Sequence, residues 1–326
     1  MREIDQSQTL QFHALLLGNT AERLARFEHA LTQRISRGDV VLDLGSGTGV
    51  LAFLALGAGA SKVYAVEETD AIELARSLSA ANGFADRIVL QQRSSSLVEL
   101  PEPADVLVAD IFDTFGLQPG GLSCLADARR RLLKPAAALI PSALELHLAP
   151  VEAHELYEQR INVWTGEISG LDLSSLHSYA VNNRYPSRFE RRALLGDAGL
   201  LARIQLKEVE TPSFGGHVMV RIARSGVLHG LSGWFVANLA EGISVDNAPG
   251  DATTKYAQTF FPIERPVSVE EGNTVKMSLQ SYDNIGCKWQ VEVIAGSQSV
   301  AKFEQDRKST RLNSSHSRAS RMPSSA

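Results

Sequence analysis

The chain has 326 residues, of which 44% are hydrophobic and 21% are charged, and its formal net charge is −5. This length exceeds what one hydrophobic core usually holds, so two domains are expected. No run of about 18 apolar residues marks a membrane span, and the polar, acidic start predicts no signal peptide. The acidic balance disfavours nucleic acid as a partner.

Cysteine and histidine usage excludes further classes. The two cysteines, Cys124 and Cys287, give neither a disulfide framework nor a metal-binding spacing. The eight histidines show no pairing at helical spacing and no neighbouring cysteine, which argues against zinc. We expect both cysteines to be core residues of a protein in the reducing cytoplasm.

The N-terminal segment, residues 1–35, is expected to be helical. Thr20 offers a hydroxyl cap, and good helix formers follow it over residues 21–27. An apolar run over residues 40–44 then predicts a buried strand.

A glycine loop follows that strand. It has the spacing D-x-G-x-G-x-G, whereas a dinucleotide loop would place its third glycine at position 50, which is Val50. Small residues let the backbone pass beneath a bulky ligand, so the loop favours S-adenosylmethionine over a pyrophosphate cofactor. The alternative is a tight strand-to-helix turn with no ligand. The candidate cofactor residues here are Asp43, Gly45, Ser46, Gly47, Thr48 and Gly49.

Two more predicted strands end in acids. The run over residues 62–67 ends in Glu67, where a second parallel strand delivers a carboxylate to ribose hydroxyls. A solvated strand end is the alternative for Glu67. The run over residues 104–110 ends in Asp110, on the strand expected to carry catalysis. Together these patterns predict an α/β doubly wound, Rossmann-like domain over residues 36–142.

Beyond residue 142 the pattern changes to short alternating strands separated by turn residues, as in an antiparallel barrel or sandwich. Residues of about 152–186 interrupt that rhythm with Trp164, Leu171, Leu173 and Leu176 among polar residues. So long an excursion predicts an arm that docks on a partner, because loops of this length are rarely structureless. Alternatively, its apolar side chains cover the flank of the same domain.

The run from Val40 to Glu67 resembles the protein arginine methyltransferases, as do residues 109–114, 128–135 and 139–141. The resemblance covers roughly residues 10 to 305. It implies a cofactor domain for S-adenosylmethionine, a β-barrel domain over residues 143–305 with a helical arm, a homodimer, and a peptide arginine held between the domains.

Two family glutamates clamp the guanidinium with bidentate hydrogen bonds at the ends of an acidic loop. The first position is Asp110 here, and the second falls at or near Pro119, which offers no side-chain acceptor. Asp113 is a candidate to take part of the missing role, or else stabilises a turn. A family histidine maps onto Lys255, whose charge would oppose a cationic substrate.

The resemblance also implies two further cofactor contacts. Arg23 corresponds to a helix arginine that pairs with the methionine carboxylate, unless it is simply one of several exposed charges. Ser96 falls where the family contacts adenine, although serine-rich loops are common for turn reasons alone.

Residues 306–326 look like the translation of a sequencing-adapter oligonucleotide and are expected to be a disordered, artefactual tail. The tail carries five basic residues and one acidic residue, so the formal net charge falls from −5 to −9 without it. A basic nucleic-acid-binding tail is the alternative.

The sequence therefore predicts N-methyl transfer to a protein or peptide side chain, with catalysis assigned to Asp110 and Asp113. A methyltransferase acting on a small molecule or another amine remains open. So does a cofactor-binding pseudoenzyme that acts as a dimeric scaffold.

Overall fold

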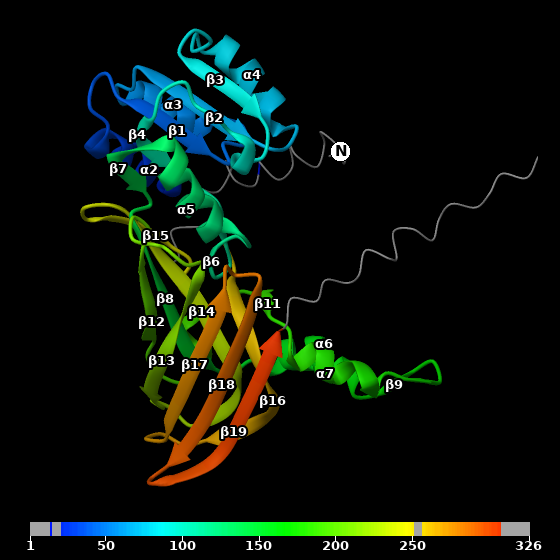
Figure 1. The fold of residues 1–326 in the computed structure, drawn as a ribbon. Coiled ribbons are helices and arrows are strands. Elements are labelled where there is room, and N and C mark those ends of the chain that lie inside the picture. Colours follow the sequence, from blue (N-terminus) through cyan, green and yellow to red (C-terminus); the bar gives the residue numbers. More distant parts are fainter. Residues whose placement is uncertain (1–13, 15–20, 251–255, 308–326) are drawn as a thin grey trace, which may run out of the picture.

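The computed structural model describes residues 14, 21–250 and 256–307. Helices surround a parallel sheet at one end of the molecule, and long antiparallel strands form the other end (Figure 1). A thin arm leaves the antiparallel part sideways. No helix among these residues is long and apolar enough to cross a bilayer.

The parallel sheet has the strand order β3-β2-β1-β4-β7. Its strands are rich in apolar residues because helices cover both faces, and all five residues of β1 are buried. The order reverses between β1 and β4, which is where open α/β sheets bind ligands. The strands are β1 (Val40–Leu44), β2 (Lys62–Glu67), β3 (Ile88–Gln92), β4 (Ala104–Val108) and β7 (Leu133–Ile140). The helices are α2 (Ala21–Arg34), α3 (Val50–Gly57), α4 (Ala71–Ala81), η1 (Ser95–Leu97) and α5 (Gly121–Leu132).

A small antiparallel hairpin lies between β4 and α5. Its strands are β5 (Phe112–Asp113) and β6 (Gly116–Leu117). This hairpin and its flanks, residues 110–119, form the acidic loop.

Two antiparallel sheets make up the second part of the chain. The first has the order β11-β16-β14-β8-β12 with β15 paired to β14, and the second has the order β13-β17-β18-β19. The first sheet contains β8 (Ala143–Val151), β11 (Tyr185–Ser187), β12 (Gly199–Gln205), β14 (Gly226–Ala240), β15 (Ile243–Asp246) and β16 (Gln258–Val269). The second contains β13 (Ser213–Arg221), β17 (Thr274–Tyr282), β18 (Gly286–Ala295) and β19 (Gln298–Arg307), and η4 (Arg191–Ala193) precedes β12.

The core of this part lies between the two sheets. Trp289 is fully buried there, and its ring meets that of Phe261 edge to face at 5.4 Å. The edges β12 and β13 approach closely, since a Cβ on Gly199 would lie 1.9 Å from the Val218 side chain. The described strands nevertheless form two separate hydrogen-bonded sheets, so the closed barrel is not confirmed.

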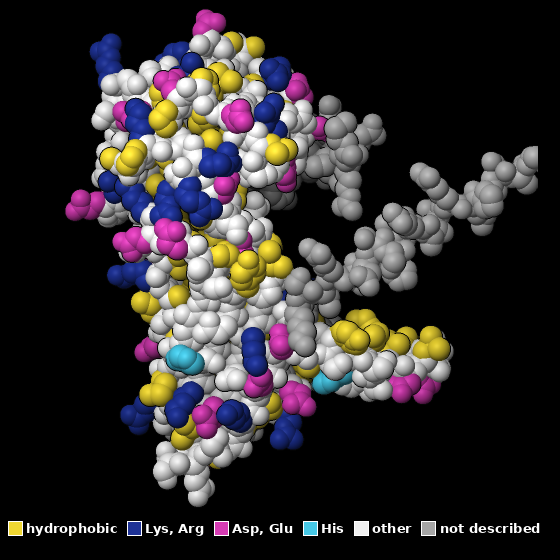
Figure 2. Space-filling model, viewed as in Figure 1, with side chains coloured by type: hydrophobic (Ala, Val, Ile, Leu, Met, Phe, Trp, Pro, Cys, Tyr) yellow, Lys and Arg dark blue, Asp and Glu magenta, His cyan; other side chains and the backbone are white. Residues whose placement is uncertain are grey.

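The arm consists of short elements: α6 (His154–Arg160), η2 (Asn162–Trp164), β9 (Glu167–Ile168), β10 (Leu171–Asp172), η3 (Ser174–Leu176) and α7 (His177–Val181). At its base Tyr157, Ile161 and Val181 form a small core with Phe260 of β16. Farther out, apolar side chains are exposed, including Leu171 at 65% and Tyr179 at 69%. Figure 2 shows hydrophobic side chains along this arm. The base covers the sheet's flank, and the outer part leaves an apolar face uncovered.

The predicted tail boundary is wrong by two residues. Asp306 and Arg307 belong to β19, where they pair with Lys288 and Cys287 of β18. The β18 ladder satisfies their backbone groups, which a compositional boundary could not detect. Residues 308–326 lie outside the described residues.

Candidate active site

A cavity of about 670 Å³ opens at the carboxyl ends of the parallel strands. The loop after β1, the end of β2, the segment after β3, the acidic loop and the start of α5 all contribute to it. Its lining includes Gly45, Gly47, Glu67, Glu68, Thr69, Arg93, Ser94, Ser95, Asp110, Phe112, Gln118, Pro119, Gly120, Gly121, Cys124 and Tyr256.

The glycine loop lies against this cavity in a conformation that side chains oppose. Gly45, Gly47 and Gly49 all have positive φ, at 73°, 53° and 79°. A Cβ on Gly45 would lie 2.6 Å from the Ile111 side chain, so the loop has no space for one. This backbone cradle fits a bulky ligand such as S-adenosylmethionine. Ser46, Thr48 and Gly49 belong to the same loop but are not among the lining residues, and their cofactor contacts stay predictions.

Glu67 joins the end of β2 to the loop. One carboxylate oxygen accepts the Gly47 amide at 2.9 Å, and the other accepts the Thr69 amide at 2.9 Å and the Thr69 hydroxyl at 2.7 Å. The side chain is thus held at the cavity wall by three donors. Its place suits a ribose diol, although the contact itself stays a prediction.

Asp43 lies beneath the loop and is only 1% exposed. Burial raises the pKa of its carboxyl group to about 7, the Ala52 amide opposes that shift, and the Glu67 charge adds to it. Asp43 is not among the lining residues. Its direct contact with a cofactor therefore stays a prediction.

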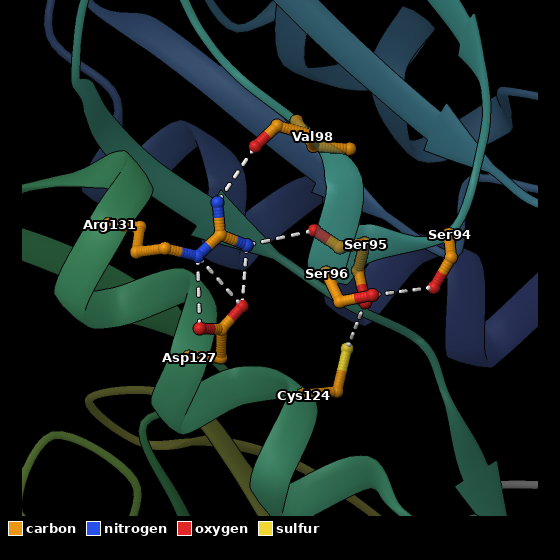
Figure 3. A network of polar contacts seen from close by, with 7 residues as sticks. All are labelled: Ser94, Ser95, Ser96, Val98, Cys124, Asp127 and Arg131. Carbon is orange, nitrogen blue, oxygen red and sulfur yellow. Dashed lines mark hydrogen bonds and ion pairs between the residues drawn. The ribbon is translucent and has the colours of Figure 1, made fainter.

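The serine run after β3 lies beside the start of α5, and polar contacts connect the two (Figure 3). Ser94 and Ser95 line it, whereas Ser96 bonds to the Ser94 hydroxyl at 3.1 Å and does not. Arg131 of α5 donates to the carbonyls of Ser95 at 3.0 Å and Val98 at 2.8 Å, which fixes η1 on α5.

Cys124 was expected in the core, and the structure corrects this. It is partly exposed, lines the cavity and lies 3.1 Å from the Ser95 hydroxyl. The feature of the sequence that could have indicated this exposure is the position of Cys124 in the first turn of the helix after the acidic loop. Cys287 is buried as expected.

Asp110 lines the cavity and forms an ion pair with Arg23 of α2. Arg23 is 3% exposed, so the alternative that it is an exposed helix charge is wrong. Burial lowers the pKa of Arg23, but an arginine stays charged at any physiological pH. Arg23, which is predicted to bind the carboxylate of the cofactor, and Asp110, which is predicted to bind the acceptor, are therefore in direct contact.

Asp113 lies outside the cavity lining, and its carboxylate is 3.6 Å from the guanidinium of Arg184. Sequence reasoning missed Arg184, which lies some 70 residues along the chain just before β11. The ion pair turns Asp113 toward the antiparallel part, so the structure brings Asp110, but not Asp113, to the cavity.

The acceptor side of the cavity is made by Phe112, Gln118, Pro119 and Tyr256 beside Asp110. The rings of Phe112 and Tyr256 meet edge to face at 6.3 Å. Burial raises the pKa of the Tyr256 phenol, so it is neutral at physiological pH. Lys255, the predicted opposing charge, lies outside the described residues.

Comparisons with known proteins agree with this architecture. A family model described as the arginine methyltransferase oligomerization subdomain matches residues 142–292, and one described as ribosomal protein L11 methyltransferase matches residues 28–146. A solved structure, the Trypanosoma brucei PRMT1 enzyme-prozyme heterotetrameric complex with AdoHcy, superposes with a TM-score of 0.83 at 22% identity, covering 93% of this chain and 99% of that one. Arabidopsis thaliana protein arginine methyltransferase 10 gives a TM-score of 0.77 at 21% identity, covering 93% and 99%.

Sequence relatives are also arginine methyltransferases by name. An arginine N(omega)-methyltransferase of Streptomyces achromogenes subsp. streptozoticus is 31% identical over 82% of this chain and 75% of its own length. Mouse protein arginine N-methyltransferase 2 is 30% identical over 83% of this chain, which spans only 61% of that protein. The chain belongs to the protein arginine methyltransferase family of class I S-adenosylmethionine-dependent methyltransferases.

Proposed function

We propose that the protein transfers a methyl group from S-adenosylmethionine to a guanidinium nitrogen of an arginine residue in a protein or peptide. The observation that carries this proposal is that Gly45 and Gly47 of the glycine loop, Glu67 and Asp110 line the same cavity at the sheet's switch point. Donor and acceptor groups bound there would share one cavity.

The bound cofactor supplies a methyl group on a sulfonium, which is a good leaving group, so the protein mainly provides position and electrostatics. Glu67 and the glycine loop would hold the donor. Asp110 accepts hydrogen bonds from the guanidinium and orients one nitrogen toward the donor. Phe112 and Tyr256, which line the cavity beside Asp110, would exclude water from the bound cation.

The clamp differs from the family's two glutamates. Pro119 lines the cavity without a side-chain acceptor, and Asp113 is engaged by Arg184. Gln118, whose side chain carries an amide, is the neighbouring lining residue. One carboxylate and one amide would hold the cation more weakly than two carboxylates.

The weaker clamp favours a second candidate acceptor, arginine as a free molecule. The Streptomyces relative, at 31% identity, is named for arginine and not for protein arginine. A free amino acid would also bring its own charged groups, which could add contacts that a peptide lacks.

We also infer a homodimer that forms through the arm, and a cytoplasmic location. The matched oligomerization subdomain contains the arm, and the outer arm carries exposed apolar side chains. Two cysteines without a disulfide partner suit a reducing compartment.

The test is incubation with methyl-labelled S-adenosylmethionine and either a glycine-arginine-rich peptide or free arginine, followed by acid hydrolysis of the peptide. Labelled methylarginine supports the proposal, and the acceptor that yields it decides between the two candidates. Asp110→Ala should abolish labelling. Cofactor binding without transfer to either acceptor would favour the pseudoenzyme alternative.

A further inference from the structure

Two of the three residues in the turn between β17 and β18 are buried, although turns usually lie at the surface. Its residues Asp283 and Asn284 are 2% and 4% exposed. Both have positive φ, at 48° and 57°, which aspartate and asparagine tolerate better than most residues. The Asp283 amide donates to the Pro212 carbonyl at 2.8 Å, which fixes the turn to the segment before β13.

Asp283 caps α5 from outside the parallel domain. The N-cap of α5 is Gly120, which has no side chain to bond the first helical amides. Asp283 supplies that acceptor: its carboxylate accepts the Leu122 amide at 2.9 Å and the Ser123 amide at 3.2 Å. Its backbone carbonyl accepts the Gly120 amide at 2.9 Å. A carboxylate at a helix N-terminus is also favoured by the helix dipole.

Asn284 holds the acidic loop. Its side-chain amide donates to the Leu117 carbonyl at 2.7 Å and the Phe115 carbonyl at 3.3 Å. Its side-chain oxygen accepts from Arg184, and its backbone carbonyl accepts from Arg184 at 3.0 Å. Arg184 also reaches Asp113 in the same loop at 3.6 Å.

These contacts surround the acceptor side of the cavity. Gln118 and Pro119 lie between the carbonyls held by Asn284 and the amides held by Asp283. Gly120, Gly121 and Cys124, which also line the cavity, belong to the start of the capped helix. The turn therefore fixes both ends of the stretch that faces the substrate.

We propose that Asp283 and Asn284 are positioning residues for the acceptor side of the site, with Arg184 linking them to the acidic loop. This role rests on the proposed function, because it concerns where the acceptor is held. The glycine loop and Glu67 have none of these contacts, so the turn should govern the acceptor and leave cofactor binding nearly unchanged.

The test compares Asn284→Gly with Asn273→Gly. Glycine adopts the positive φ of Asn284 without strain, so this variant removes the side chain alone. Asn273 lies at the other end of β17, where its side chain accepts the Glu270 amide at 3.1 Å, so it controls for the loss of an asparagine side chain away from the acidic loop. We measure kcat/KM with the better of the two acceptors, and calorimetry gives the affinity for S-adenosylhomocysteine. The rates of amide hydrogen exchange are followed over residues 111–123.

In Asn284→Gly we expect acceptor kcat/KM to fall about tenfold or more, because misplacement of a positioned substrate is costly to rate, while affinity for S-adenosylhomocysteine changes less than about threefold. The Gln118 amide, which donates to the Ile111 carbonyl at 2.9 Å, should exchange faster. Asn273→Gly should match the unmodified protein in all three measurements.

Asn284→Asp is a second variant for the case that the glycine variant does not fold. The aspartate keeps an oxygen that can accept from Arg184, but it removes both hydrogen bonds to the Phe115 and Leu117 carbonyls. Amide hydrogen exchange in the acidic loop should therefore become faster in this variant as well. Unchanged exchange and unchanged kcat/KM in the folded variants would overturn the positioning role. If the unmodified protein methylates neither acceptor, the proposed function fails, and the exchange of the loop still decides whether the turn holds it.

Discussion

Asp43 is the buried carboxyl group beneath the glycine loop. Its pKa rises from an ordinary value of 3.8 to about 7 because burial disfavours the charge. The folded protein therefore keeps a proton that the unfolded chain releases above about pH 4. The stability contributed by this protonated group is full at low pH and is lost as the pH rises toward 7.

We predict that Asp43→Asn, which cannot ionise, is more stable than the unmodified protein at pH 8, by on the order of 1 to 4 kcal/mol. The difference should grow between pH 5 and pH 7 and then level off. Urea unfolding across this range measures it, with Asp86→Asn on an exposed side chain as the control. A difference that does not depend on pH would show that Asp43 is ionised in the folded state.

Glu67 is predicted to hold the cofactor ribose. Glu67→Ala removes an acceptor for two hydroxyl groups, which should cost about 1.5 to 3 kcal/mol of binding free energy. Calorimetry with S-adenosylhomocysteine measures the loss, and Glu73→Ala on the exposed face of α4 serves as the control. Equal affinity in the Glu67 variant would remove this residue from the site.

The acceptor clamp contains one shortened acid, Asp110, and no acid at Pro119. Because an unpaired buried cation is costly, we predict low turnover of a glycine-arginine-rich peptide by the unmodified protein. Asp110→Glu combined with Pro119→Glu should raise kcat/KM about tenfold by restoring bidentate contacts. Asp110→Glu with Pro119→Gln has the same shape without the second charge and should gain less. Robust turnover by the unmodified chain would show that this pocket binds the guanidinium in another way.

At the scale of elements, the arm is predicted to form the dimer interface. Leu171→Asp with Tyr179→Asp places two charges on its exposed apolar face, and burying unpaired charges opposes association. Light scattering should report a dimer for the unmodified protein and a monomer for this variant. Met219→Asp, which replaces an apolar residue that is 67% exposed on β13, should stay dimeric. A monomeric unmodified protein at micromolar concentration would defeat the prediction.

Local patterns could be predicted from the sequence because they depend on neighbouring residues. The glycine loop, Glu67 and Asp110 follow buried strands directly, so their positions at one sheet edge followed from the strand order. Asp283, Asn284 and Arg184 could not be found in this way. They reach the acidic loop from other elements, and a turn-forming Asp-Asn pair carries no sign of the helix that it caps.

Contacts from distant elements also decide the different roles of the two acids in the acidic loop. Asp110 and Asp113 are three residues apart and were both candidates for catalysis, yet one pairs with a helix before the sheet and the other with a residue beside the arm. Which acid faces the cavity depends on these distant arginines. The closed barrel was not confirmed for a related reason, since alternation predicts strands but not whether their outer edges pair.

At the scale of the whole molecule, the Arg23–Asp110 ion pair connects two binding equilibria. The cofactor carboxylate is predicted to need Arg23, and the acceptor cation needs Asp110, so each ligand must displace one half of the same pair. The first ligand to bind breaks the pair and leaves the other half available. Each ligand should therefore tighten the binding of the other by the same factor, about 5- to 150-fold.

Titrating S-adenosylhomocysteine with and without acceptor, and acceptor with and without S-adenosylhomocysteine, measures that factor twice. In Asp110→Asn the coupling factor should be close to one. Independent binding of the two ligands to the unmodified protein would contradict the coupling. The demethylated product carries the same carboxylate as the cofactor, so it too would free Asp110 and retain the acceptor. Product inhibition should then become stronger as the acceptor concentration rises, and turnover in a cell would depend on how quickly S-adenosylhomocysteine is removed.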